Sequence, residues 1–241
     1  MAESVVSLDS PDNRVYRVLS FPREVDFEGR LRELRALGVE HMIFEGPTEL
    51  EGFRVLGKGC TSVVVKAKGV WGYVAVKIRR TDSDREDMFH EAFCTVLANS
   101  VGVGPKVFAF SPNFLVLELL EGAPIGDWIR KAPADLLIRV VDSLMRKAFA
   151  LDAIGLDHGE LSRAQRHVLI SDSRPRILDF ESASVRRKPK NLTSIVQYVM
   201  RSTDKSLDGE TISLLREYKK SPSLENYAKV RQRVIDILRR G

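Results

Sequence analysis

Hydrophobic and polar positions follow a short period in the first half of the chain. Runs rich in β-branched residues alternate with turns that contain glycine, which is the pattern of an antiparallel sheet. These runs predict five strands, at residues 53–56, 62–67, 73–78, 107–111 and 114–119. A helix is predicted between the third and fourth strands, at residues 84–99. The first half is therefore expected to be a five-stranded antiparallel sheet with one helix.

The second half has the longer period of helices. Residues 135–154 place leucine, valine and alanine at helical spacing and predict a buried helix. Two short β-like runs, 168–170 and 176–178, flank a turn at residues 171–175. Three further helices are predicted at residues 193–201, 210–219 and 224–240. An α+β architecture follows, with a β-rich part and a mainly helical part.

The first fifty residues carry a smaller pattern. Residues 14–21 suit a strand, residues 26–37 suit a helix, and residues 41–44 suit a second strand. A β-α-β unit of this size is too small for a core of its own, so it is expected to pack on the sheet that follows. The chain is thus predicted to have three parts: residues 1–50, 51–121 and 122–241.

The composition is that of a folded protein. Hydrophobic residues make up 44% of the 241 residues and charged residues 29%, which excludes an intrinsically disordered chain. The formal net charge of +5 and the pI near 9.2 favour an anionic partner such as a nucleotide, a nucleic acid or an acidic protein. Cys60 and Cys94 lie far apart without a cysteine or histidine cluster, so no disulfide framework or zinc site is expected.

The sequence lacks the patterns of secretion and of membrane insertion. It does not open with a basic head followed by an apolar run, and no apolar stretch is long enough to span a bilayer. A cytoplasmic location without a membrane partner is therefore expected.

A glycine-bearing turn, Gly57-Lys58-Gly59, lies between the first two predicted strands. Its position between two strands, rather than between a strand and a helix, disfavours a dinucleotide-binding Rossmann site. Glycines let the backbone approach phosphate oxygens, so a hairpin of this kind can cover a nucleotide. An ordinary hairpin turn is the alternative interpretation.

Lys77 interrupts the apolar run 73–78, where a charged side chain needs an anionic partner or an exit to water. Glu91 lies in the helix predicted next along the chain. A strand lysine that pairs with a helix carboxylate and reaches the phosphates of ATP is the arrangement of protein kinases. The alternative is a solvated lysine and an exposed glutamate.

These features together resemble the amino-terminal lobe of protein kinases. The segment 115–122 resembles the strand and hinge that follow in that family, and by this resemblance Glu118 and Leu120 would offer backbone groups to adenine. The resemblance covers about residues 52–200. It is closest to the minimal, atypical kinases of the RIO type and to predicted archaeal serine/threonine protein kinases.

Two later segments carry the same resemblance. Residues 156–161, Leu-Asp-His-Gly-Glu-Leu, resemble the catalytic loop of kinases, and residues 177–181, Ile-Leu-Asp-Phe-Glu, resemble their metal-binding D-F-G segment. The resemblance implies a bilobal kinase-like fold that uses ATP with Mg²⁺ or Mn²⁺. It implies the following site: Gly57, Lys58 and Gly59 over the nucleotide, Lys77 and Glu91 at the phosphates, Asp179 at the metal, and Glu160 orienting the acceptor hydroxyl.

Three positions depart from the kinase pattern. Glu160 stands where the family carries a catalytic aspartate. Gln165, five residues further, stands where an asparagine ligand of the second metal is expected, and His167 is the favoured ligand if the loop is two residues longer. A polar loop residue that binds no metal is the alternative interpretation of His167. An amide oxygen suits Mg²⁺, whereas imidazole is a better ligand for Mn²⁺. Glu181 replaces the glycine of D-F-G, and no long activation loop follows it.

A basic segment, residues 186–190, follows the metal segment and could attract RNA or an acidic protein. A solvated basic loop is the alternative. The leading hypothesis for the chain is an atypical serine/threonine protein kinase with an unidentified protein substrate. A catalytically impaired pseudokinase, acting as an ATP-binding switch or scaffold, is the first alternative, and a small-molecule kinase is the second.

Overall fold

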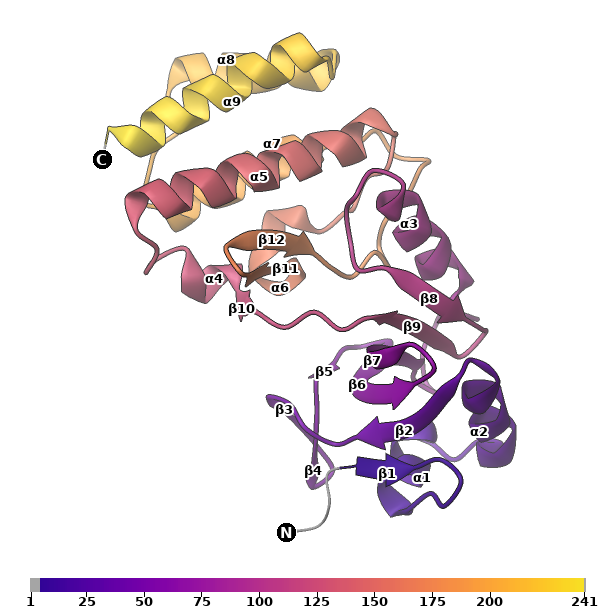
Figure 1. The fold of residues 1–241 in the computed structure, drawn as a ribbon. Helices are drawn as coiled ribbons and strands as arrows, with labels where there is room; N and C mark the ends of the chain where they lie inside the picture. Colours follow the sequence, from indigo (N-terminus) through magenta and orange to yellow (C-terminus); the bar gives the residue numbers. More distant parts are fainter. Residues whose placement is uncertain (1–4, 241) are drawn as a thin grey trace. The chain divides into compact units, whose positions relative to one another are not determined.

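The computed structural model describes residues 5–240, and the chain within this range is α+β, as predicted. It divides into two units. Unit 1 runs through Phe93 and includes the segment Lys106–Leu119, whereas unit 2 comprises Cys94–Pro105 and the chain from Leu120 onward. Each unit contains both strands and helices (Figure 1).

Unit 1 is built on a seven-stranded antiparallel sheet (Figure 1). Six strands follow one another in the order β1 (Val5–Ser7), β2 (Val39–Ile43), β6 (Ser62–Gly69), β7 (Gly72–Arg79), β9 (Phe114–Glu118) and β8 (Val107–Phe110). The seventh strand, β5 (Gly57–Lys58), pairs with β6 off this path. The sheet is larger than the five strands predicted, because the amino-terminal segment adds β1 and β2 at the edge of β6.

The strand predicted at residues 53–56 does not continue into the main sheet. β4 (Phe53–Val55) pairs instead with β3 (Thr48–Leu50) in a two-stranded sheet. Glu51 and Gly52 connect these strands, and both have a positive φ, of 47° and 90°. A two-residue turn with positive φ at both positions matches the twist of a tight hairpin, so the chain reverses at this point.

The strand predicted at residues 14–21 is wrong, because helix α1 (Asn13–Leu19) occupies this segment. Asp12 caps the helix by accepting hydrogen bonds from backbone N–H groups of its first turn. The buried residues of the helix are Val15, Val18 and Leu19. This spacing is that of one helix face and not the alternation of a strand.

The other two helices of unit 1 are near their predicted positions. α2 (Phe27–Ala36) begins after Asp26, whose side chain accepts from the N–H of Gly29. The amino-terminal segment is therefore β-α-α-β and not the β-α-β unit predicted. α3 (Phe89–Asn99) begins later than predicted and continues from unit 1 into unit 2. The largest apolar core of unit 1 combines residues of α1 and α2 with one face of the sheet.

Unit 2 contains most of the helices. They are α4 (Ile125–Trp128), α5 (Ala134–Ala153), a 3-10 turn (Leu161–Arg163), α6 (Ala164–His167), α7 (Asn191–Ser202), α8 (Gly209–Lys220) and α9 (Leu224–Arg239). The predictions of α5, α7, α8 and α9 are confirmed within a few residues. The short helices α4 and α6 were not predicted, since a single turn has no apolar period to recognise.

A small antiparallel sheet accompanies these helices. Its order is β10 (Ala123–Pro124), β11 (Val168–Ser171) and β12 (Arg174–Ile177). Asp172 and Ser173 make the turn between β11 and β12 and have φ values of 48° and 60°. The turn is thus a tight two-residue hairpin, shorter than the turn predicted at residues 171–175.

The core of unit 2 is centred on α5, which packs against α7 and α9 (Figure 1). Fully buried residues of α5 include Val140, Val141, Leu144 and Ala148. They recur at the spacing of one helix face, which is the pattern that predicted a buried helix. Within residues 5–240, no helix combines the length and the hydropathy that a membrane span requires.

Candidate functional site

In unit 1, Lys77 and Glu91 form a buried ion pair. Lys77 Nζ lies 2.7 Å from Glu91 Oε1, and the two side chains are only 8% and 6% exposed. β7 supplies the lysine and α3 supplies the glutamate. Two charges withdrawn from water stabilise each other but give little net stability to the fold. The predicted pairing is present. Because it adds little stability, a role for Lys77 other than holding the fold together has to be considered.

The strand register places Lys77 in a row with the glycine turn. Gly57 is opposite Val64, and Val64 is opposite Lys77, so the three residues share one face of β5, β6 and β7. Ala75 and Leu117 pair directly and lie on this same face, one row along. Val64, Ala75 and Leu117 were not predicted as site residues, because strand alternation alone does not give the register that aligns them.

Neither Gly57 nor Gly59 is required by the fold. Their φ values are not positive, a Cβ at Gly57 would meet nothing within 4 Å, and a Cβ at Gly59 would lie 3.6 Å from its nearest atom. Arg80 steadies the turn by donating to the carbonyl of Gly59 at 2.9 Å. The ammonium of Lys58 lies 4.7 Å from the centre of the Phe21 ring. The backbone of this turn can therefore be approached closely by another molecule.

The two predicted adenine contacts fall at the end of unit 1. Glu118 is the last residue of β9, and its N–H donates to the carbonyl of Lys106 at 2.9 Å. This N–H is therefore not available to a ligand. Leu120 lies just beyond, in unit 2, outside the helices and strands.

In unit 2, a chain of contacts joins four predicted or neighbouring polar residues. Glu160 Oε2 lies 3.0 Å from His167 Nε2, and the other nitrogen of this ring, Nδ1, lies 3.3 Å from Asp179 Oδ2. The second approach has ion-pair distance without hydrogen-bond alignment. Ser182 donates its hydroxyl to Glu160 Oε1 at 3.0 Å. His167 is 7% exposed, whereas Glu160 and Asp179 are 38% and 37% exposed.

The β11–β12 hairpin brings His167 and Asp179 together. His167 ends α6 just before β11, Asp179 follows β12, and the N–H of Leu178 donates to the carbonyl of His167 at 2.8 Å. Asp179 has a φ of 65°, in the left-handed region that non-glycine residues seldom occupy. Such a backbone costs about 1 kcal/mol or more and is often found at functional sites.

Gln165 and His167, the two candidates for a second metal ligand, lie differently. Gln165 is exposed on α6, with its Cβ packed over Gly126 of α4. His167 is buried between Glu160 and Asp179. The structure therefore brings His167, and not Gln165, beside the acidic groups in unit 2.

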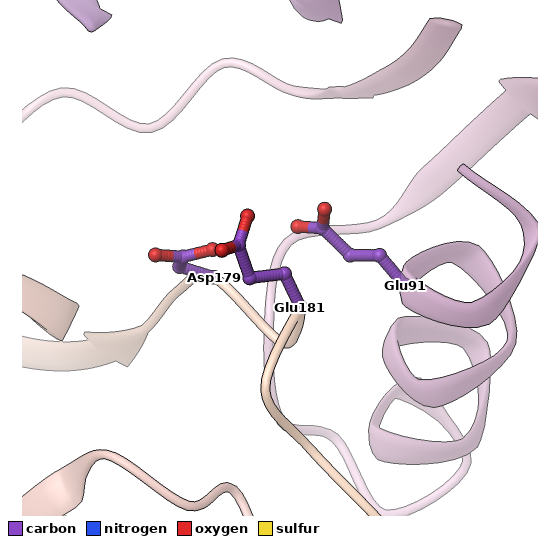
Figure 2. A group of neighbouring side chains, drawn as sticks. All are labelled: Glu91, Asp179 and Glu181. Atoms are coloured by element: carbon purple, nitrogen blue, oxygen red, sulfur yellow. The ribbon is translucent and has the colours of Figure 1, made fainter. Parts of the chain in front are cut away.

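Asp179 and Glu181 supply two carboxylates from one short segment. Figure 2 shows both side chains on the chain that leaves β12, and it shows Glu91 on α3. Oxygen atoms of Asp179 and Glu181 lie within 4.8 Å of each other. Phe180 between them is fully buried and faces Gly104 and the His158 ring. Two carboxylates at this separation are ligands that Mg²⁺ and Mn²⁺ accept, so the residues present fit a divalent cation.

His158 braces the loop that carries Glu160. Its ring is completely buried, and Nε2 lies 2.9 Å from the carbonyl oxygen of Leu178. Because a carbonyl can only accept, Nε2 carries the proton in this contact. Burial lowers the pKa of His158 to about 4, although the bond to this carbonyl acts in the opposite direction. His158 is therefore neutral at neutral pH and ties the loop to the segment before Asp179.

A buried polar network supports the same loop from behind. The carboxylate of Asp152 in α5 accepts hydrogen bonds from Tyr218 Oη, Asn191 N, Asn191 Nδ2 and Leu192 N, at 2.7 to 3.1 Å. Asn191 in turn accepts from the N–H of His158 at 2.9 Å. Burial raises the pKa of Asp152, and these hydrogen bonds oppose that effect. The network fixes α5, α7 and α8 relative to the loop. No sequence motif predicted this network.

The basic segment at residues 186–190 also contributes to the loop. Arg187 Nε donates to Asp157 Oδ2 at 2.9 Å, and its Nη2 donates to the carbonyl of Ser182 at 2.5 Å. Backbone N–H groups of Asp157 and Ser184 exchange hydrogen bonds with each other's carbonyls. One cation of the segment thus has a structural partner, while binding of RNA or an acidic protein by this segment stays a prediction.

No protein-family model matches the chain. Among curated proteins, it is similar to the uncharacterized protein MJ1211 of Methanocaldococcus jannaschii, with 29% identity over 80 residues. The match covers 33% of this chain and 68% of that protein. This relative comes from an archaeon, and its description names no activity.

Proposed function

We propose that the chain is an ATP- and divalent-metal-dependent phosphotransferase, an atypical serine/threonine protein kinase with a bilobal arrangement of its two units. The observation that carries the proposal is the position of Lys77, buried against Glu91 and in one row with Val64 and Gly57. The ammonium of Lys77 is held 2.7 Å from Glu91 Oε1, and a lysine ammonium is a cation with three N–H donors, the kind of group that binds phosphate oxygens.

The roles of the residues follow from their chemistry. In unit 1, Gly57 and Gly59 leave the backbone open to phosphate oxygens, while Val64, Ala75 and Leu117 offer an apolar surface to a base.

In unit 2, Asp179, Glu181 and His167 would hold the divalent cation, which supplies charge neutralisation for the transferred phosphoryl group. Glu160 orients the attacking hydroxyl and accepts its proton.

Glu160 is one methylene longer than the aspartate of typical kinases, and in this chain two side chains fix the position of its carboxylate. His167 contacts one oxygen of the carboxylate and leaves the other directed at a hydroxyl group, that of Ser182. The carboxylate is thereby held in one orientation, as a catalytic group must be.

A pseudokinase is the second candidate function, favoured by the same contact. Both oxygens of Glu160 already have partners within unit 2, so an external hydroxyl has to displace Ser182. In that case the chain would bind ATP and act as a switch or scaffold without transfer. A small-molecule kinase is the third candidate, since nothing in the site selects a protein hydroxyl.

The test is incubation with γ-labelled ATP and Mg²⁺ or Mn²⁺, with label followed on the chain itself and on a generic protein. Label is expected in the parent and is expected to fall to background in Lys77→Ala, Asp179→Ala and Glu160→Gln. Asp135→Ala, which changes an exposed carboxylate of α5, is the matched control and should transfer like the parent. Thermal stabilisation by ATP without any transfer would support the pseudokinase instead.

A further inference from the structure

The hydroxyl of Ser182 lies where the proposed function would place the hydroxyl of an acceptor. It donates to Glu160 Oε1 at 3.0 Å, and Glu160 is the carboxylate proposed to take the proton of the attacking hydroxyl. A nucleophile within hydrogen-bond reach of its base, with the base oriented by a third group, is the signature of an activated nucleophile. Here His167 is the third group, at 3.0 Å from the other oxygen of Glu160.

Ser182 is held in this position from both sides. Its own carbonyl accepts from Arg187 Nη2, and the next residue, Ala183, donates its N–H to the carbonyl of Phe180. Ala183 and Phe180 are buried, so the backbone on either side of Ser182 is anchored in the core of unit 2. The residue itself is half-buried and not enclosed in the core.

We propose that Ser182 is an intramolecular phosphorylation site of this chain. This inference rests on the proposed function and names the first acceptor of the phosphoryl group. Ser182 Oγ attacks the γ-phosphorus of bound ATP, the bond from Oγ to phosphorus forms, and the bond from that phosphorus to the β,γ-bridging oxygen breaks. The proton of the hydroxyl passes to Glu160, and ADP leaves with the electron pair of the broken bond.

The charges around Ser182 make the reaction self-limiting. Phosphoserine carries nearly two negative charges and three strong acceptor oxygens. It removes the hydroxyl that Glu160 contacts and places negative charge beside this carboxylate, which disfavours a second transfer. Arg187, already bonded to the carbonyl of Ser182, is the cation within reach of the product. One phosphate per chain is therefore expected.

The experiment incubates the full chain with Mg²⁺ or Mn²⁺ and ATP and locates phosphate by peptide mass spectrometry. Phosphate is expected on Ser182 in the parent, with a first-order rate that does not change with chain concentration, as transfer within one chain requires. Ser182→Ala should remove it. Ser184→Ala is the matched control, because Ser184 lies in the same segment and its hydroxyl accepts from the N–H of Arg186; it should leave the Ser182 phosphate intact.

Other outcomes separate this inference from the proposed function. Transfer to a generic protein with no phosphate on Ser182 would overturn the inference and leave the phosphotransferase standing. Phosphate on Ser182 at a rate proportional to chain concentration would also overturn it, since the site would then serve a second copy. Absence of any ATP turnover, in chains that circular dichroism shows to be folded, would overturn both.

Discussion

Two glycine-bearing turns of the molecule differ in whether their conformation and surroundings require glycine. Gly159, in the loop of unit 2, has a φ of 88°, and a Cβ there would lie 2.8 Å from the carbonyl oxygen of Ser182. Gly57 and Gly59, in the turn of unit 1, have neither a positive φ nor a close neighbour. Gly159 is therefore required, because a side chain there would be strained and would collide with a backbone carbonyl. The other two have room for a side chain, so the fold does not require glycine at these positions.

The surroundings of the two turns point the same way. The loop at residues 157–160 is tied down by Arg187, by Asn191 and by paired backbone groups of Asp157 and Ser184. The turn at residues 57–59 is largely exposed. It is held by the pairing of β5 with β6, by the hydrogen bond from the N–H of Gly59 to the carbonyl of Ser62, and by Arg80. A buried and tied loop suits residues that must hold an orientation, whereas an exposed hairpin turn suits one that closes over a ligand.

The largest effect is expected at Gly159. Gly159→Ala should lower the free energy of unfolding of unit 2 by about 3 kcal/mol, because a side chain at positive φ is strained and its Cβ would press on a backbone carbonyl that cannot yield. Denaturant unfolding followed by circular dichroism measures this change. Phosphate transfer should be lost as well, since Glu160 follows directly.

Gly155 provides the control for that substitution. It also has a positive φ, of 76°, but no atom lies within 4 Å of its would-be Cβ. Gly155→Ala should therefore cost only the backbone strain, about 1 kcal/mol. Equal losses in the two variants would show that the contact with Ser182 does not matter.

A smaller effect concerns pH and the buried His158. Its folded-state pKa of about 4 lies below that of an exposed histidine, so the unfolded chain binds a proton that the folded chain does not. Stability from this source is present at neutral pH and is lost as pH falls, by about 2 kcal/mol between pH 7 and pH 5.

Unfolding of the parent and of His158→Gln at both pH values isolates this contribution. The Gln variant should lack it. His90→Gln, at an exposed position of α3, should behave like the parent. A parent whose stability is the same at both pH values would mean that His158 is not held neutral.

The smallest effect on folding is expected in the turn of unit 1. Gly57→Ala and Gly59→Ala should each change the free energy of unfolding by less than about 1 kcal/mol, because the space for a methyl group exists. ATP affinity, measured by calorimetric titration, should nevertheless fall about tenfold, or about 1.4 kcal/mol. Unchanged ATP affinity would show that no phosphate approaches this backbone.

Much of the fold could be predicted from the sequence, and the failures have physical reasons. Long apolar periods predicted α5 and α9, and valine-rich runs predicted β6 and β7. The strand prediction for residues 14–21 failed because a segment this short fits either the strand or the helix period, and the cap at Asp12 favours the helix. The extra width of the sheet depends on which edge the amino-terminal segment joins, a long-range choice without a local signal.

The candidate site was predictable only where it depends on motifs. The positions of Lys77, Glu160 and Asp179 were recognised from short patterns, although their roles stay predictions. The contact between Ser182 and Glu160 was missed because it joins segments that meet only when the β11–β12 hairpin closes. A serine directly after a recognised motif has no sequence pattern of its own that would identify it.

The chain passes three times between its two units, so the units cannot be separated by expressing two consecutive fragments. A fragment that begins at Leu120 would lack Cys94, Ala98 and Val103, which are all buried in the core of unit 2. A fragment that stops at Leu119 would carry these apolar side chains without the helices that cover them. Dividing the gene at a single point therefore does not give two fragments with complete cores. A chimaera that replaces unit 2 has to replace residues 94–105 together with the chain from Leu120 onward.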